Sequence, residues 1–358
     1  MNSLLRHPFR AFCFFFTFIF FSISPELTSS YELLSTDLQK RYRQILLPNV
    51  TGPESIAFDC RGRGPYVGVS DGRILKWLGA RRGWSEFAVT SPGRKRELCD
   101  GSTDPRMEQT CGRPLGLKFD NRTCELYIAD AYFGLLKARR GGSGAAEQLA
   151  AGYGGIPFKL TNALDVDPLS GDVYFTDSSR FYERRDYIMA IARGDRSGRV
   201  MKYNRRTGKV TVLLSRLSFP NGLALSKDNS FLVIAETGKI QLLRFWVRGP
   251  RAGTTEVFAQ LGRYPDNIKR NHKGEFWVAL NSGRGSLQTE AVSYVAEDAI
   301  PWFTKDPVAI KYDPNGRVME MMDGKYEKTF ESVSEVAEFS QTLWIGSVTM
   351  PYLGKFKV

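Results

Sequence analysis

Four oxygen-bearing side chains stand at one recurring place in the sequence, where a turn leads into a short apolar strand. Each is a carboxylate or a carboxamide, and Asn267, directly after the last of them, is a further candidate metal ligand. We call the four the oxygen set: Glu54, Asn162, Asn221 and Asp266. Singly, each is an ordinary turn residue. Together they would form a hard cage of net charge about −2, which suits Ca²⁺ and offers no soft ligand for zinc or copper.

The histidine count excludes several familiar kinds of active site. The chain holds only His7 and His272, and His7 lies in a segment that we expect to be removed. One remaining histidine cannot build a histidine-rich zinc site or a two-histidine dyad. His272 lies in a polar run that is typical of a turn, which argues against a Ser-His-Asp triad. The sequence also lacks the Walker and GxGxxG motifs.

A repeat with six copies supplies the elements that must position the oxygen set. Each copy has a turn, a polar residue, an alternating strand, a second turn and a second strand that ends near Asp, Glu or Ser. The copies begin near residues 53, 114, 161, 220, 265 and 334, and most continue into a third and a fourth strand. Six units of four antiparallel strands predict an all-β fold, a six-bladed β-propeller whose inner strands surround a central channel.

Two stretches interrupt the strand pattern. Residues 182–193 predict a short amphipathic helix with Tyr187, Ile188 and Ile191 on one side, and residues 287–303 form a second insertion. Such insertions either shape a ligand pocket or pack at the periphery. Five aromatic side chains are candidates for an apolar pocket mouth, or for core between the blades: Phe158, Tyr132, Phe133, Tyr182 and Tyr187.

The first residues predict entry into the secretory pathway. Arg6 and Arg10 precede an apolar run over residues 11–23, which as a helix reaches only about 20 Å and is short for a membrane span. We therefore expect residues 1–28 to be a cleaved signal peptide and residues 29–358 to be the propeller. Vacuole, endoplasmic reticulum lumen and extracellular space remain open. Asn49 and Asn121 begin N-glycosylation sequons.

The net charge of +12 comes from basic residues scattered in pairs along the chain. Dispersed charge of this kind is typical of a solvated surface, and we expect no nucleic-acid partner. We expect a small-molecule substrate, and membrane contact only through the signal peptide. The sequence does not indicate an oligomeric state.

Several runs resemble the plant strictosidine synthase-like family. They are residues 60–66 (CRGRGPY), 111–117 (CGRPLGL), 127–135 (YIADAYFGL), 157–163 (PFKLTNA) and 264–270 (YPDNIKR). The resemblance extends from about Gly52 to the C-terminus. It implies the six-bladed propeller again, and kinship with calcium-dependent lactonases, arylesterases and phosphotriesterases. Those hydrolases hold calcium with Glu, Asn, Asn and Asp at the matching blade starts.

The resemblance also has a departure. Related lactonases carry a histidine pair above the metal, which this chain cannot match. Hydrolysis would therefore use Asp266 as nucleophile or base, or a water activated by the metal. Leu115 and the sixth copy offer no ligand, which leaves the cage open on one side for a substrate oxygen.

The four cysteines of the mature chain permit disulfides in an oxidising compartment. Cys99 and Cys111 enclose a polar loop without a core of its own, and the matching loop of the family is bridged. We expect this pair to be bonded, which would contribute about 3 kcal/mol in the chain-entropy model. Whether Cys60 and Cys124 pair stays open, because the sequence does not give their distance.

Three functions remain. We expect first a calcium-dependent hydrolase of esters, lactones or organophosphates. Strictosidine-type Pictet–Spengler condensation is second, and a non-catalytic propeller with structural calcium is third. The synthase uses a buried glutamate of its sixth blade, and counting back from Trp344 places Ser334 there. If Ser334 points into the channel, strand alternation predicts that Glu335 points away.

Overall fold

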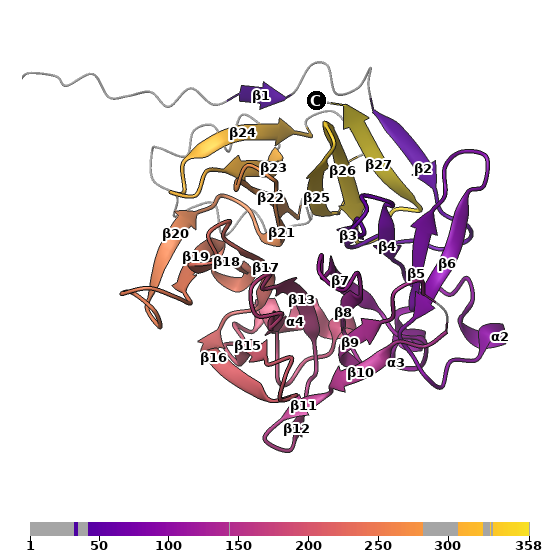
Figure 1. The fold of residues 1–358 in the computed structure, drawn as a ribbon, viewed down its shortest axis with the longest axis horizontal. Coiled ribbons are helices and arrows are strands. Elements are labelled where there is room, and N and C mark those ends of the chain that lie inside the picture. Colours follow the sequence, from indigo (N-terminus) through magenta and orange to yellow (C-terminus); the bar gives the residue numbers. More distant parts are fainter. Residues whose placement is uncertain are drawn as a thin grey trace, which may run out of the picture. The chain divides into compact units, whose positions relative to one another are not determined.

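The computed structural model describes residues 32–34, 42–142, 144–281, 307–324, 330 and 332–357. These residues form the six-bladed β-propeller that the sequence predicts, with the blades set around a central axis (Figure 1). The expected signal peptide, residues 1–28, and the second insertion, residues 287–303, lie outside the described residues. Within the described ranges, no helix has the length and apolar character needed to cross a lipid bilayer.

Each of the first four blades is an antiparallel sheet of four strands in chain order. Blade 1 contains β3 (Ile56–Ala57), β4 (Tyr66–Gly68), β5 (Arg73–Trp77) and β6 (Trp84–Val89). Blade 2 contains β7 (Pro114–Phe119), β8 (Leu126–Asp130), β9 (Gly134–Ala138) and β10 (Glu147–Ala150). Blade 3 contains β13 (Thr161–Val166), β14 (Val173–Asp177), β15 (Gly198–Tyr203) and β16 (Val210–Leu217). Blade 4 contains β17 (Pro220–Leu225), β18 (Phe231–Glu236), β19 (Gln241–Trp246) and β20 (Thr255–Gln260).

The last two blades recruit strands from the start of the chain. Blade 5 contains β21 (Pro265–Arg270), β22 (Phe276–Leu280), β23 (Pro307–Tyr312) and β24 (Val318–Asp323), and β1 (Glu32–Leu34) pairs parallel to β24. Blade 6 contains β25 (Val333–Phe339), β26 (Thr342–Ser347) and β27 (Tyr352–Lys357). Its fourth strand is β2 (Arg43–Leu46), which pairs antiparallel with β27 and closes the ring. A small hairpin of β11 (Gly152–Tyr153) and β12 (Ile156–Pro157) leads from blade 2 to blade 3.

The core lies between neighbouring blades. Between blades 4 and 5, the rings of Phe258 and Phe276 meet edge to face with 6.0 Å between their centroids. Because inner strands have a blade on both sides, β13 and β17 are buried at every residue. A turn follows each of the first three inner strands. In each turn an aspartate accepts a hydrogen bond from the backbone N–H of the residue two positions later. These aspartates are Asp59, Asp120 and Asp167.

Short helices occupy the connections. The segment between blades 1 and 2 holds α2 (Arg96–Cys99), η1 (Pro105–Met107) and α3 (Glu108–Cys111), where the sequence predicted only a polar loop. The predicted helix at residues 182–193 is present as η2 (Arg184–Asp186) and α4 (Tyr187–Ala192), inside blade 3. A further turn, η3 (Thr237–Lys239), lies in blade 4.

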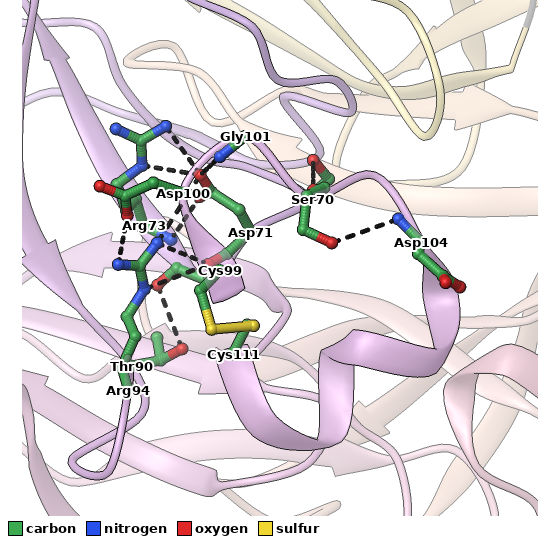
Figure 2. Close-up of a disulfide and its surroundings, with 12 residues drawn as sticks. Ser70, Asp71, Arg73, Thr90, Arg94, Cys99, Asp100, Gly101, Asp104 and Cys111 are labelled. Carbon is green, nitrogen blue, oxygen red and sulfur yellow. Dashed lines mark hydrogen bonds and ion pairs between the residues drawn. A yellow bond between two sulfur atoms is a disulfide. The ribbon is translucent and has the colours of Figure 1, made fainter. Parts of the chain in front are cut away.

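Two disulfides join these elements. The expected bond between Cys99 and Cys111 is present, with 5.4 Å between the Cα atoms (Figure 2). Cys60 and Cys124, whose pairing the sequence left open, form a second disulfide that ties blade 1 to blade 2. Both bonds are consistent with folding in an oxidising compartment of the secretory pathway.

Candidate functional site

A cavity of about 240 Å³ lies where the inner strands of the blades begin. All four members of the oxygen set line it, each from a different blade, as the repeat predicted. Leu115 of blade 2 and Val348, which follows β26 of blade 6, complete the ring without an oxygen-bearing side chain. Asn267 does not line the cavity, because its Nδ2 donates instead to the backbone oxygen of Glu54 at 3.4 Å.

A shared backbone irregularity presents three of these side chains. In β13, β17 and β21, pairing with the next strand slips between the first and the fourth residue. Such a slip breaks the regular alternation of side chains and re-aims one of them. The second residue of each strand is the member of the oxygen set: Asn162, Asn221 and Asp266. Next to Asn221, a Cβ on Gly222 would lie 2.5 Å from the Ile268 nitrogen, so glycine lets blades 4 and 5 approach here.

Buried acids fix the loops that lead into these strands. Each acid is the last residue of the second strand of its blade. It accepts a hydrogen bond from a backbone N–H in the segment just before the inner strand. The acids are Asp130, Asp177 and Glu236, and their donors are the backbone nitrogens of Arg113, Leu160 and Ser218, at 2.8, 3.2 and 2.9 Å. The sequence pattern contained these acids, and the structure shows that they fix the segments leading into the inner strands.

The two asparagines keep their oxygens available. Asn162 donates through Nδ2 to the Ser178 hydroxyl at 3.0 Å, and that hydroxyl donates to the Pro220 carbonyl at 2.8 Å. The Oδ1 atom of Asn221 is buried and has no hydrogen-bond partner among the described residues. An unpaired buried oxygen costs free energy unless a ligand satisfies it. Both amides are therefore arranged to accept a donor or a cation.

The two carboxylates of the oxygen set lie close enough to repel each other. Burial, and then the charge of Glu54, raise the pKa of Asp266 well above its ordinary value. Two carboxylates that share a buried site titrate in this way. Together with the free amide oxygen, this donor set fits a hard divalent cation such as Ca²⁺, which takes six to eight oxygen ligands.

The buried Arg113, the partly buried Arg184 and a third acid surround the site, and the sequence analysis missed all three. Arg113 donates to Glu54 Oε2 at 2.6 Å, and Arg184 lies 3.7 Å from the same atom. Arg184 also donates to Glu108 Oε1 at 3.0 Å. Around the cavity, the carboxylates of Glu54, Glu108 and Asp266 thus face two guanidinium groups. Arg113 directly precedes the Pro-Leu pair that starts blade 2. This position was the sequence feature from which its place beside the site could have been predicted.

Of the two alternatives for the aromatic candidates, most of them take the core rather than the pocket mouth. Of the five side chains proposed for the mouth, only Tyr187 lines the cavity. Tyr132 and Tyr182 pack behind it, against the cluster around Leu160. Phe158 and Phe133 belong to the core between blades, because they pack against inward residues of the neighbouring sheet.

The sixth-blade residues also differ from expectation. Ser334 donates to the Glu54 carbonyl at 2.8 Å and does not line the cavity. Glu335 does not point away: its carboxylate lies 3.3 Å from the ammonium of Lys269, which also contacts the Leu117 carbonyl of blade 2 at 3.0 Å. Lys269 belongs to blade 5, so its side chain crosses the channel. Alternation fails because the pairing of β25 slips between Val333 and Glu335.

Comparison with solved structures gives the same architecture. A gluconolactonase from Xanthomonas campestris superposes with a TM-score of 0.59 at 16% identity, covering 88% of this chain and 89% of the other. The calcium-binding protein regucalcin from Agrobacterium tumefaciens superposes with a TM-score of 0.59 at 13% identity, covering 91% and 95%. At these identities the likeness shows the fold alone.

Comparison of sequences gives the family. A model described as strictosidine synthase matches residues 162–250, and one described as strictosidine synthase-like, N-terminal, matches residues 40–77. The protein strictosidine synthase-like 10 of Arabidopsis thaliana is 46% identical over 341 residues, covering 90% of this chain and 89% of the relative. Strictosidine synthase-like 3 of the same plant is 42% identical over 352 residues, covering 90% and 88%. The chain belongs to the strictosidine synthase-like family.

Proposed function

We propose that this protein is a calcium-dependent hydrolase of esters, lactones or organophosphates. One observation carries the proposal: the oxygen set converges from four blades on one cavity, with the Asn221 Oδ1 atom unpaired among the described residues. Four oxygen-bearing side chains from separate blades, buried together around one cavity, are an expensive arrangement for a purely structural channel.

The residues of the cavity divide the work of hydrolysis. Arg113 fixes the Glu54 carboxylate, and Ser178 fixes the Asn162 amide, so both oxygens are held in place before a ligand arrives. In this proposal Asp266 would act as the nucleophile or general base. When bound, Ca²⁺ would polarise a carbonyl or phosphoryl oxygen and keep Asp266 ionised. Apolar walls that include Leu115 and Phe219 would exclude bulk water from the reacting atoms.

The synthase alternative has less support. Pictet–Spengler condensation needs a group that moves protons, and no carboxylate of blade 6 is among the described residues that line the cavity. Glu335, the nearest such carboxylate in sequence, is held by the Ile56 N–H at 2.6 Å and by Lys269. Its carboxylate is therefore committed to contacts with blades 1 and 5.

We also propose that the protein works in the lumen of the secretory pathway and carries N-glycans. Asn49 and Asn121 are both exposed, so an oligosaccharide at either position would extend into solvent without disturbing a blade.

The test combines calcium binding with a hydrolase panel. Purified protein is assayed by calorimetry for Ca²⁺, and with a lactone, an aryl ester and a phosphotriester, each in calcium and in EDTA. Asp266→Ala should weaken calcium binding more than tenfold, over about 1.4 kcal/mol, because a charge and a ligand are lost. Asn162→Ala should do less, because only a neutral oxygen is lost.

Asp186→Ala is the matched control for Asp266→Ala, since Asp186 is exposed and lies outside the cavity lining. Calcium binding that is equal in wild type and Asp266→Ala would refute the assignment of the site. Calcium binding without hydrolysis of any panel substrate would instead favour the non-catalytic propeller with structural calcium.

A further inference from the structure

One cationic side chain reaches the cavity with most of its hydrogen-bond donors unused. Arg184 lines the cavity, and its Nη1 donates to Glu108. Its Nη2 lies 3.7 Å from Glu54 Oε2, which is too long for a hydrogen bond. A guanidinium carries five N–H donors, and the described residues accept no other hydrogen bond from this one. The side chain keeps 14% of its surface open.

Glu108 and the segment that carries it hold Arg184 in this position. Glu108, its acceptor, is buried and also accepts a hydrogen bond from the Tyr132 hydroxyl at 3.1 Å. Glu108 opens α3, which ends at the Cys99–Cys111 disulfide (Figure 2). A buried acceptor on a cross-linked segment makes the guanidinium a preorganised donor group.

The Cys99–Cys111 segment is itself fastened to blade 1. Arg94 pairs with both Asp71 and Asp100 beside the disulfide, and Asp71 also accepts the Gly101 N–H at 3.0 Å (Figure 2). The support for Arg184 therefore extends through α3 to the blade framework, and does not depend on a free loop.

The wall beside Arg184 is apolar and partly open. Ile188 and Ile191 of α4 line the cavity together with Leu115 and Phe219. Ile188 is 50% exposed, so it lies at the rim where the cavity meets solvent. A ligand that fits this surface has an apolar chain along α4 and a head group that accepts hydrogen bonds from Arg184.

We propose that the cavity selects amphipathic carboxylates, and the esters or lactones that release them, with Arg184 as the residue that binds the head group. Guanidinium and carboxylate match in a planar, charge-assisted pair. Glu54 is paired with Arg113, and Glu108 accepts only one hydrogen bond from Arg184, so the other donors of Arg184 remain for a head group. An ammonium head group would meet the positive charge of Arg184. The inference rests on the proposed function, since the carboxylate is the product of that hydrolysis.

Three eight-carbon ligands test the head-group preference: octanoate, 1-octanol and octylamine. Their tails are identical, so differences in affinity report the head group alone. Binding to the full-length protein is measured by calorimetry in calcium and in EDTA. We expect octanoate to bind at least tenfold more tightly than octylamine in both buffers. Octylamine binding as tightly as octanoate, or no measurable octanoate binding, would overturn the proposal.

Substitutions then test the residue. Arg184→Met should weaken octanoate binding about tenfold and leave 1-octanol within about twofold. Arg184→Lys should recover part of the loss because it keeps the charge, and it serves as the second variant if Arg184→Met does not fold. Arg185→Met is the matched control: Arg185 lies beside Arg184, pairs with Glu183 and is outside the cavity lining. Equal octanoate affinity in wild type and Arg184→Met would overturn the assignment.

The two buffers separate this proposal from the proposed hydrolase. Arg184 belongs to the chain, so its effect on octanoate binding is expected with or without calcium. If the panel shows no hydrolysis while the Arg184 effect persists, the proposed function fails and the binding preference stands. If hydrolysis is found but Arg184→Met leaves octanoate binding unchanged, the preference fails alone.

Discussion

Lys269 offers the sharpest test of how the channel is held together. Its ammonium contacts Leu117 O at 3.0 Å, Ser55 Oγ at 3.3 Å and Glu335 Oε2 at 3.3 Å, which joins blade 5 to blades 2, 1 and 6. Glu335 is 1% exposed. Lys269→Met keeps an unbranched side chain one atom shorter, removes the ammonium and leaves Glu335 buried without a cationic partner.

The expected cost of Lys269→Met is about 3 kcal/mol. Removing one partner of a buried ion pair typically costs about 3 to 5 kcal/mol. The lower end applies here, because the Glu335 carboxylate keeps hydrogen bonds from the Ile56 N–H at 2.6 Å and the Ser55 hydroxyl at 2.9 Å. For a chain of this size, about 2 °C of melting temperature per kcal/mol gives a fall of roughly 6 °C.

The pH dependence of this loss provides a second readout. Burial raises the pKa of Glu335, while Lys269 acts in the opposite direction. Without Lys269, the pKa of Glu335 in the folded state rises further above its unfolded value. Folded protein then gains stability as the carboxyl is protonated, and loses it as pH rises. The destabilisation by Lys269→Met should therefore be smaller at pH 5.5 than at pH 7.5.

Thermal unfolding followed by circular dichroism measures both effects. Lys269→Met combined with Glu335→Gln should recover about 2 kcal/mol of the loss, because no uncompensated charge remains. The reasoning is refuted if the double variant is as unstable as Lys269→Met, or if the loss is the same at both pH values.

Three further predictions follow from other parts of the fold. Gly72→Ala should destabilise the protein far more than Gly79→Ala, as measured by urea unfolding. Both glycines have a positive φ, but of the two only Gly72 would place an added Cβ against a backbone oxygen, that of Cys111, at 1.7 Å. Replacing Cys60 and Cys124 together by serine should cost about 4 kcal/mol in the same assay, since their bond closes a long loop; a loss below about 1 kcal/mol contradicts this. Tryptamine and secologanin should yield no strictosidine by mass spectrometry, because no sixth-blade carboxylate lines the described part of the cavity; robust product would favour the synthase.

The repeat made the fold and the oxygen set predictable. Turn residues and strand alternation are local, so six similar copies show both the number of blades and the position that each copy directs toward the axis. Asn221 and Asp266 occupy equivalent places in their copies, and the structure brings them to one cavity. Local pattern was sufficient because the propeller repeats the same unit around one axis.

The residues that the sequence analysis missed depend on packing between distant segments. Glu108 and Arg184 are 76 residues apart and meet only because the blade 1–2 connection folds against the insertion of blade 3. Glu335 was misplaced for a different reason: strand alternation holds only in a regular ladder, and the pairing of β25 slips just before it.

The closure of blade 6 by β2 imposes an order on biosynthesis. Leu46 of β2 pairs with Tyr352 of β27, roughly 300 residues later. At about 5 to 20 residues per second, the ribosome needs about 15 to 60 s to make the partner of a strand that has already emerged. During that interval the edge of β2 that will pair with β27 has no partner strand. Blades 1 and 2 can meanwhile be cross-linked through Cys60 and Cys124, so the early half of the propeller is secured before the ring closes.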